Sequence, residues 1–520
     1  MRKILMSVLL SFAGVVFGNA ANPEKHVVLV VWDGMRPDFV NQTNTPTLYE
    51  LANRGVFFAH HHPVYVSSTE VNGAALATGD YPENSGIIGN REFHPDIDPL
   101  AAFETESLNA MRKADGQGGY LSAPTVAGIL QHQGYSTAVA GCKSVVLLHD
   151  HAERTDNATN IVVYEGHTLP ENELSNLVQA LGPFRDIGST KTNRDTWTAR
   201  ALTESVWKKG VPAFSLLWLA EPDNTQHGTG VGSPQSLAAI RNSDHALSLV
   251  VKALKEHGVY DTTDIFVVSD HGFSTISTNV DMAAKLRSAG FKVYRQFKKP
   301  PVKGHVLLVG LGGSVLLYVT GHDAKTIDGI VKFLEMENTV GAIFTSRALP
   351  GTFALDDALI HSKYAPDIAF SFRWTADVNA NGAPGEIVSE AQGSNITPIA
   401  QKATHASLSP YDMHNTLVAA GPDLRRAFTD ETPTGNEDVA PTILKILGVK
   451  SPQPMNGRVL SEALNSSGGK SPAIDKKELQ ARVALPAGER IQTLDITEVH
   501  GVRYLNDATV EFAPKQTASQ

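Results

Sequence analysis

The sequence has very little cysteine: Cys142 is the only one in 520 residues. A single thiol cannot form an intramolecular disulfide, so the stability of the folded chain must come from a packed core. We interpret Cys142 as a small buried apolar residue. Because no cysteine lies near the N-terminus, a lipoprotein anchor is not expected there.

Long apolar runs are also scarce. One run extends from Ile4 to Phe17, after Arg2 and Lys3, and small residues follow it. This order is typical of a secretory signal peptide, here residues 1–20, and the run is short for a membrane-spanning helix. We therefore expect no membrane span after cleavage, and a periplasmic or secreted protein.

Positive charge is in the minority, with 44 Lys and Arg against 54 Asp and Glu and a formal net charge of −10. Removing residues 1–20 takes away two positive charges and no negative ones, which changes −10 to −12. This balance argues against a nucleic acid polymer as partner. It leaves open a small anionic substrate held at a local metal site. The sequence does not indicate an oligomeric state.

Short apolar runs alternate with helical segments along the first half of the chain. Runs rich in Val, Ile and Leu at 26–33, 135–141, 213–221 and 264–270 are typical of strands buried on both faces. Helical segments at 45–55, 123–134, 194–210 and 236–258 separate them. The alternation predicts an α/β fold, a doubly wound, mostly parallel sheet with helices on both faces.

The alternation of strands and helices is interrupted after residue 273, and this interruption predicts the domain organisation. We expect a core over 21–273, an inserted β-rich cap over 274–400, and a second part of the core over 401–464. Residues 465–520 begin with the Ser- and Gly-rich stretch "NSSGGKSPA" and are predicted to form a linker and a small C-terminal β element.

Three aspartates follow apolar runs: Asp33 in "VVWDG", Asp223 in "LAEPD" and Asp270 in "VVSDHG". Open α/β sheets bind ligands just beyond the carboxyl ends of their strands, so these side chains are expected to share one site. Clustered carboxylates repel one another unless a cation is present. The pattern therefore predicts a metal site.

Histidines accompany these aspartates. His227 lies four residues after Asp223, His271 directly follows Asp270, and His405 lies far along the chain. A mixed set of carboxylates and imidazoles suits two Zn²⁺ ions, although other divalent metals remain open. Taken singly, each aspartate is also explained as a cap or turn residue, and each histidine as a hydrogen-bonded polar side chain.

Thr69 lies where an apolar segment gives way to the Ala-rich segment "TEVNGAALATG". Thr is a poor residue for the interior of a helix but a good N-cap, so capping is one explanation. The other is that Thr69 is a nucleophile, and a residue at the start of a helix can serve both purposes.

Six motifs occur in order between about 26 and 464: "VVWDGMRPD", "TEVNGAALATGDYPENSGIIGN", "AEPDNTQHG", "VVSDHGF", "THASLSP" and "GNEDVAPTILKILG". In these motifs the chain resembles the type I phosphodiesterase/nucleotide pyrophosphatase family of the alkaline phosphatase superfamily. The resemblance implies that Thr69 is the nucleophile and that a covalent phospho-threonine intermediate forms. It also implies two metal sites, one formed by Asp33, Asp270, His271 and Thr69, the other by Asp223, His227 and His405.

The resemblance also places Asn90 where the family has an Asn that donates to the phosphoryl oxygen; a turn Asn is the alternative. Asn72 stands three residues after the nucleophile and is expected to border the substrate. Between Thr69 and Asn72, Glu70 stands where the family usually has an apolar residue and Val71 stands where it usually has Pro. These two departures lie next to the expected leaving-group pocket and argue against nucleotide recognition. Lys143 ends an apolar run and is expected to contact a substrate carboxylate or phosphonate, or else to be solvated.

The histidine tract at 60–62 resembles a metal site, but we interpret it as a surface or structural feature. The leading function is a two-metal phosphodiesterase or nucleotide pyrophosphatase acting on small phosphoesters. The alternatives are a phosphonoacetate-type C–P hydrolase and a zinc-bound binding protein without activity. A zinc protease is disfavoured because H-E-x-x-H is missing. A sulfatase is disfavoured because Thr69 occupies the nucleophile position.

Overall fold

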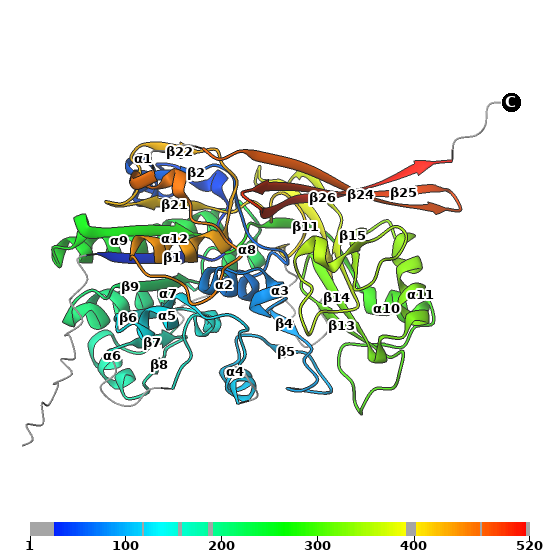
Figure 1. Cartoon of the computed structure of the whole chain (residues 1–520), viewed down its shortest axis with the longest axis horizontal. Coiled ribbons are helices and arrows are strands. Elements are labelled where there is room, and N and C mark those ends of the chain that lie inside the picture. Colours follow the sequence, from blue (N-terminus) through cyan, green and yellow to red (C-terminus); the bar gives the residue numbers. More distant parts are fainter. Residues whose placement is uncertain are drawn as a thin grey trace, which may run out of the picture.

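The computed structural model describes residues 25–116, 119–153, 159–185, 191–391, 402–467 and 471–515. The expected signal peptide lies outside the described residues. A nine-stranded sheet forms the core of one half of the molecule, on the left in Figure 1, in the order β22-β2-β21-β10-β1-β9-β6-β7-β8. In chain order its strands are β1 (His26–Trp32), β2 (Val56–Phe58), β6 (Thr137–Gly141), β7 (Ile161–Tyr164), β8 (His167–Leu169), β9 (Phe214–Leu219), β10 (Thr263–Val268), β21 (Leu417–Ala420) and β22 (Phe428–Asp430).

The middle of this sheet is parallel. Strands β10, β1, β9, β6 and β7 run in the same direction, and antiparallel pairs occur at β21 and β8. The four runs expected to be strands from the sequence are β1, β6, β9 and β10, and all residues of these strands are buried. The prediction of a doubly wound, mostly parallel α/β sheet is confirmed.

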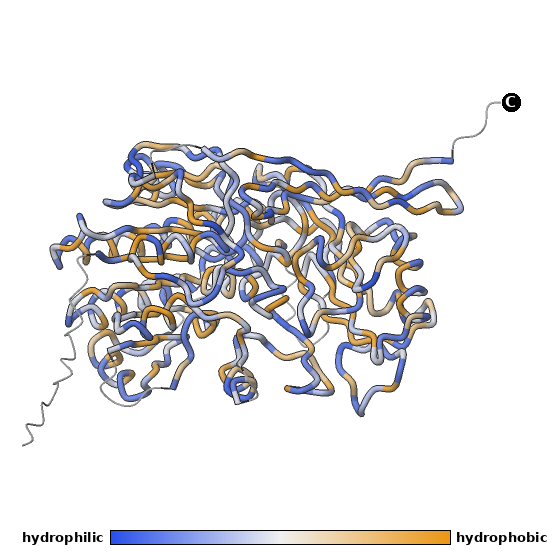
Figure 2. The backbone as a smooth tube through the Cα atoms, in the orientation of Figure 1, coloured by the Kyte–Doolittle hydropathy of each residue, from blue (hydrophilic) through white to orange (hydrophobic). Residues whose placement is uncertain are grey.

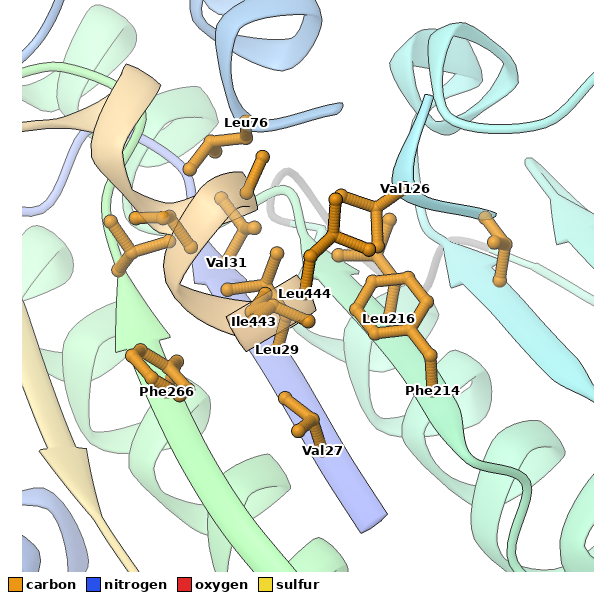
Figure 3. Packing of buried hydrophobic residues seen from close by; sticks show 14 of the residues in the cluster. Val27, Leu29, Val31, Leu76, Val126, Phe214, Leu216, Phe266, Ile443 and Leu444 are labelled. Carbon is orange, nitrogen blue, oxygen red and sulfur yellow. The ribbon is translucent and has the colours of Figure 1, made fainter. Parts of the chain in front are cut away.

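Successive side chains of a strand point to opposite faces of the sheet. Because the strand residues on both faces are apolar, helices cover both faces. Val27, Leu29 and Val31 of β1 pack in one buried cluster with Ile443 and Leu444, which come from α12 (Figure 3). Val28 and Val30 belong to the cluster on the opposite face. The helices of the first face include α2 (Thr69–Thr78), α5 (Val126–His132) and α12 (Val439–Ile446); those of the second include α1 (Pro46–Arg54), α7 (Thr192–Arg200) and α9 (Pro234–Glu256).

The region that the sequence analysis expects to be an inserted cap, called the insertion below, carries two further sheets. The six-stranded sheet has the order β12-β13-β14-β17-β15-β16, and the four-stranded sheet has the order β18-β19-β11-β20. Two helices, α10 (Met282–Ser288) and α11 (Ala324–Glu335), belong to this region. The strands are β11 (Ser274–Val280), β12 (Val293–Tyr294), β13 (Val306–Gly310), β14 (Ser314–Val319), β15 (Val340–Thr345), β16 (Phe353–Ala354), β17 (Ile368–Phe372), β18 (Trp374–Val378), β19 (Pro384–Glu390) and β20 (Ala403–Thr404).

The C-terminal segment forms a long antiparallel sheet of three strands, β24 (Ile474–Leu485), β25 (Gly488–Val499) and β26 (Val502–Pro514). It runs along one side of the molecule from the core to beyond the insertion (Figure 1). Hydrophilic and hydrophobic residues alternate along these strands (Figure 2). Arg490 and Gln492 of β25 are buried and bind backbone groups of β15. The sheet is therefore packed against the insertion rather than appended to it.

The remaining elements are short. They are β3 (His61–His62) paired with β23 (Thr434–Gly435), β4 (Arg91–Glu92) paired with β5 (Phe103–Glu104), and the helices α3 (Pro82–Ser85), α4 (Leu108–Asp115), α6 (Glu173–Leu181) and α8 (Asp223–Thr229). Within the described ranges, no helix combines the length and apolar character needed to cross a membrane. Cys142 is buried and forms no disulfide, as the sequence predicts.

Candidate active site

Three aspartates converge at the carboxyl edge of the central sheet. Strands β9, β1 and β10 are adjacent and parallel, so their carboxyl ends meet. Asp33 follows β1, Asp223 begins α8 just after β9, and Asp270 follows β10. Their exposed fractions are 0%, 4% and 0%. The convergence expected from the strand ends is present.

The three histidines surround these carboxylates. His271 Nε2 lies 3.3 Å from Asp270 Oδ2 and 3.6 Å from Asp33 Oδ1. His227 Nε2 lies 3.2 Å from Asp223 Oδ1, and His405 Nε2 lies 3.6 Å from the same oxygen. The rings of His271 and His405 stack with their centroids 3.7 Å apart.

The structure holds two groups of side chains in which every candidate ligand atom lies within 4.8 Å of the others. The first is Asp33, Asp270 and His271, the set that the family resemblance implies around Thr69. The second is Asp223, His405 and again His271, whereas the resemblance implies His227 there. His227 is not a member of this second group, although its Nε2 lies 3.2 Å from Asp223 Oδ1 and its ring centroid lies 5.3 Å from that of His405. His271 belongs to both groups.

The donor atoms fit metal ions. Asp33 Oδ1, Asp223 Oδ1 and Asp270 Oδ2 are buried and have no hydrogen-bond partner among the described residues. Buried polar atoms without a partner are costly, and a bound cation would supply the missing interaction. Burial and the neighbouring Asp33 carboxylate hold the pKa of Asp270 well above its usual value. Burial also raises the pKa of Asp33 to about 6.

The histidines are oriented as metal ligands require. His227 Nδ1 lies 2.9 Å from the Ala403 carbonyl, and His271 Nδ1 lies 2.9 Å from that of Gly272. His405 Nδ1 lies 3.0 Å from the Ser67 carbonyl. A ring that donates from Nδ1 to a carbonyl presents an unprotonated Nε2, the arrangement found around protein-bound metals. Burial lowers the pKa of His271 to about 4, which also favours the neutral ring.

Thr69 is the first residue of α2, and its Oγ1 lies 3.3 Å from His271 Nε2. Ser68 rather than Thr69 occupies the N-cap position, and the Ser68 side chain makes no capping hydrogen bond. Thr69 is therefore not the N-cap of α2, because it lies one residue after that position. The Thr69 hydroxyl points to the first metal-ligand group.

Asn90 and Lys143 lie beside this group, in different ways. Asn90 Oδ1 accepts a hydrogen bond of 3.3 Å from the backbone N–H of Glu70, so Asn90 lies at the start of α2. Lys143 Nζ donates to Asp33 Oδ2 at 2.8 Å and lies 3.5 Å from Asp223 Oδ2. The ammonium group thus holds the outer oxygens of two aspartates whose other oxygens face the histidines.

Asn72 does not contact the site with its side chain, and our expectation that it borders the substrate does not fit the structure. Its side-chain oxygen accepts from the Val64 N–H at 2.8 Å and from the Asn436 amide at 2.9 Å. Its amide donates to the carbonyls of Val64 and Ser68. All its hydrogen-bonding atoms are therefore committed inside the protein, because the residue is fully buried.

Sequence reasoning missed two supports of the aspartates. Trp218 Nε1 donates to Asp33 Oδ2 at 3.1 Å, and Asn436 Nδ2 donates to the Asp270 carbonyl at 2.8 Å. Trp218 is a polar-tipped residue inside an apolar strand run, which is the one signal that the sequence offered.

The histidine tract is separate from the metal-ligand groups. His61 and His62 are buried in β3 and bind Thr434 of β23, so their role is structural. His60 lies 3.2 Å from Glu431, an acidic neighbour that sequence reasoning did not foresee.

The fold and the strand-end cluster together define a metal-dependent hydrolase architecture of the α/β class. Residues 27–381 match the family model of Type I phosphodiesterase / nucleotide pyrophosphatase. This match covers more than half of the chain, and the chain therefore belongs to that family.

Relatives of known name are similar to this chain and carry names of the same family. Venom phosphodiesterase of Naja atra is 24% identical over 255 residues, which cover 49% of this chain and 27% of that protein. The bis(5'-adenosyl)-triphosphatase enpp4 of Xenopus laevis is 22% identical over 446 residues, which cover 84% of this chain and 80% of that protein. The chain thus spans about a quarter of the first relative and most of the second.

The fold has solved counterparts. Murine ectonucleotide pyrophosphatase / phosphodiesterase 5 superposes with a TM-score of 0.60 at 19% identity, covering 85% of this chain and 100% of that chain. The human protein of the same name gives the same values. An inactive variant of the murine protein, solved in complex with AMP, superposes with a TM-score of 0.59.

Proposed function

We propose that the protein is a two-metal phosphodiesterase or nucleotide pyrophosphatase-type hydrolase with Thr69 as its nucleophile. The observation that carries this proposal is the way in which carboxylate oxygens, imidazole nitrogens and one hydroxyl face one another. Three aspartates have buried oxygens that find no hydrogen-bond partner among the described residues, the Nε2 atoms of three imidazoles lie within 3.6 Å of these oxygens, and one hydroxyl lies 3.3 Å from the shared His271.

In this proposal the Thr69 oxygen attacks phosphorus in line with the leaving oxygen. The Oγ1–P bond forms as the bond from phosphorus to the leaving oxygen breaks, and a phospho-threonine results. Water then hydrolyses this ester and restores the hydroxyl. The mixture of carboxylate and imidazole donors suits Zn²⁺. When bound, two such cations would lower the pKa of the Thr69 hydroxyl and neutralise the negative charge that develops on the phosphoryl oxygens.

The residues of the chain position the phosphoryl group. Thr69 stands at the N-terminus of α2, where the helix dipole favours an anionic group. Asn90 is oriented by the Glu70 N–H through its side-chain oxygen, so its amide can donate to a phosphoryl oxygen. Lys143 keeps the outer oxygens of Asp33 and Asp223 occupied, and this directs their inner oxygens to the cations. A small phosphoester is the substrate class, and we propose a location outside the cytoplasm.

The test uses the full chain, its metal content measured by elemental analysis, and three substrates: bis-p-nitrophenyl phosphate, a nucleotide diester and phosphonoacetate. We expect about two zinc ions per chain and turnover of the diesters. Turnover of phosphonoacetate alone would establish the C–P hydrolase instead, and no turnover with bound zinc would favour a binding protein.

Thr69→Ala tests the nucleophile. We expect the variant to retain its metal and to lose at least about a thousandfold in kcat/KM, because the substitution removes the hydroxyl that we propose as the nucleophile. Thr69→Ser is the matched control, since it keeps a hydroxyl at the same position and should retain measurable turnover. Unchanged activity in Thr69→Ala would refute the assignment.

A further inference from the structure

Asp412 is a fully buried carboxylate that the proposed mechanism does not use. Its Oδ1 accepts a hydrogen bond from the Ser274 hydroxyl at 2.6 Å. Its Oδ2 accepts from the Ser407 hydroxyl at 2.5 Å and from the Ser407 N–H at 3.0 Å. Ser274 comes three residues after His271, and Ser407 comes two residues after His405. The Asp412 side chain therefore links the two chain segments that carry these histidines.

A series of hydrogen bonds leads from Asp412 to the His271 ring. The Asp412 carbonyl accepts from the Gly272 N–H at 2.8 Å. The carbonyl of the same Gly272 lies 2.9 Å from His271 Nδ1. The residue that orients the His271 ring is thus bound directly to the Asp412 backbone.

A second series leads from the Asp412 side chain to the His405 ring. Ser407, which binds Asp412 Oδ2, accepts a hydrogen bond at its carbonyl from the Ser67 hydroxyl at 2.8 Å. The Ser67 carbonyl in turn lies 3.0 Å from His405 Nδ1. Each of the two rings is therefore oriented at Nδ1 by a carbonyl whose residue is bound to Asp412, directly or through Ser407.

The separation of these two rings matters for metal binding. His271 and His405 stack with their centroids 3.7 Å apart, and both belong to the second metal-ligand group, together with Asp223. Zinc–nitrogen bonds are about 2.0–2.1 Å long, so a small shift of either ring changes the fit of the ion. The groups bound to the outer nitrogen of a metal-ligating histidine orient the ring and affect metal affinity.

Asp244 is a buried aspartate with a different kind of partner. It is 4% exposed, and its oxygens accept from the backbone N–H groups of Leu48 at 2.9 Å and Thr47 at 3.0 Å. Both groups belong to the first turn of α1, and neither adjoins a candidate metal ligand in the sequence. Asp244 thus resembles Asp412 in burial but fixes the start of a helix.

We propose that Asp412 is a positioning residue that sets the spacing of His271 and His405 and so holds the second metal-ligand group together. The inference rests on the proposed function, because it takes both histidines as metal ligands. The side chain of Asp412 supplies the links to Ser274 and Ser407, whereas its backbone supplies the link to Gly272. Loss of the side chain should therefore release the His405 segment and leave the first metal-ligand group in place.

The test measures zinc binding by the full chain, independently of turnover. Metal is removed with a chelator, zinc is returned, and competition with a chromogenic chelator gives the dissociation constant of each site. Asp412→Ala should weaken one of the two sites by at least about tenfold and leave the other nearly unchanged. Excess zinc should restore its turnover of bis-p-nitrophenyl phosphate. Two unchanged sites, or equal weakening of both, would overturn the proposal.

Two further variants separate positioning from general stability. Asp412→Asn is the conservative change, because its side-chain oxygen can accept from Ser407 while its amide donates to the Ser274 hydroxyl, and it should retain the weakened site. Asp244→Ala is the matched control: it should lower the melting temperature and keep both zinc constants. Asn as defective as Ala at 412, or the same zinc loss in the control, would contradict the role given to Asp412.

Ser274→Ala decides the case in which Asp412→Ala does not fold. It removes only the hydrogen bond to Asp412 Oδ1, and should weaken the same zinc site by about fivefold, the scale of one hydrogen bond. Unchanged zinc constants in Ser274→Ala would then overturn the proposal.

The outcomes separate this inference from the function on which it rests. An unsubstituted protein that binds no zinc would overturn the assignment of the histidines as ligands, and both proposals with it. Two tightly bound zinc ions in every variant, with turnover of diesters, would overturn the role of Asp412 alone.

Discussion

The protein contains two polar clusters built around buried aspartates, and the hydrogen-bonding needs of these aspartates are met in opposite ways. The metal-ligand cluster consists of Asp33, Asp223 and Asp270. The scaffold cluster consists of Asp438, Arg458 and Tyr504. In the first, each aspartate keeps one buried oxygen without a partner among the described residues. In the second, Asp438 Oδ1 accepts from the Arg458 N–H at 2.7 Å, and its Oδ2 accepts from Gly435 at 2.8 Å and from the Tyr504 hydroxyl at 2.7 Å.

This difference distinguishes a site from a support. Both kinds of aspartate are fully or almost fully buried, so burial alone does not separate them. What separates them is whether the partner belongs to the chain. Single carboxylate oxygens without a partner among the described residues also occur at the buried Asp264 and Asp430, so the metal-ligand cluster is marked by three such oxygens that lie beside imidazoles. The comparison therefore predicts opposite responses to mutation in the two clusters.

The largest expected effect is in the metal-ligand cluster. Asp270→Asn should reduce kcat/KM by at least about a thousandfold, because it removes an anionic ligand from the first group. In chelator-treated protein the same change should leave the melting temperature unchanged or raise it, since it removes a repelling buried charge. Activity assays and thermal unfolding with and without chelator measure both parts. A fall in stability without metal would place Asp270 among the structural aspartates.

The scaffold cluster should respond in the reverse way. Asp438→Ala removes three hydrogen bonds and a charge beside Arg458, and should lower the free energy of unfolding by about 3 kcal/mol. Urea unfolding measures this loss. The variant that remains folded should keep its kcat within about twofold of the unsubstituted protein at low temperature. A thousandfold loss of kcat in folded Asp438→Ala would mean that the two clusters are not separable.

Acid should act on the histidines that connect the two clusters. His61 lies 2.8 Å from Thr434 Oγ1 and 2.9 Å from Asn436 Oδ1, and burial lowers its pKa to about 3. An unfolded histidine has a pKa of about 6.5, so the unfolded chain binds more protons between these values. The contribution of neutral His61 to the free energy of unfolding is therefore fully present above pH 6.5, and it is lost as the pH falls toward 3. The loss at pH 5 amounts to about 2 kcal/mol.

Unfolding free energies measured between pH 7 and pH 5 check this dependence. His61→Gln should make the curve less steep, because one of the buried histidines with a pKa of about 3 is gone while His62 and His149 still titrate. His60→Gln, which changes an exposed histidine of the same tract, is the control and should keep the slope. An equal slope in His61→Gln and the unsubstituted chain would contradict the prediction.

The same comparison explains what the sequence could predict. Strand runs ending in aspartate placed Asp33, Asp223 and Asp270 correctly, because the carboxyl ends of adjacent parallel strands must meet. The second ligand group was less predictable: helical spacing put His227 beside Asp223, but the stacking of His271 on His405 is a tertiary contact. Asn72 was misassigned because its partners, Val64 and Asn436, are set by packing between distant segments.

The C-terminal sheet shows the same limit. The sequence predicts a small β element within 465–520, yet nothing in that segment showed that Tyr504 would reach Asp438, or that Arg490 would be buried against β15. Such contacts depend on how the sheet lies against the core and the insertion, and no local pattern encodes that arrangement.

The smallest predicted effect tests whether this sheet belongs to the scaffold. The Tyr504 hydroxyl donates to Asp438 and accepts from Arg458 Nε at 2.9 Å, and its ring stacks on His62. Tyr504→Phe keeps the ring and removes both bonds, so the free energy of unfolding should fall by about 1 kcal/mol. Tyr49→Phe, at an exposed tyrosine, is the matched control and should change nothing measurable. If Tyr504→Phe were as neutral as the control, β26 would rest on the core without stabilising it, and the scaffold cluster would end at Arg458.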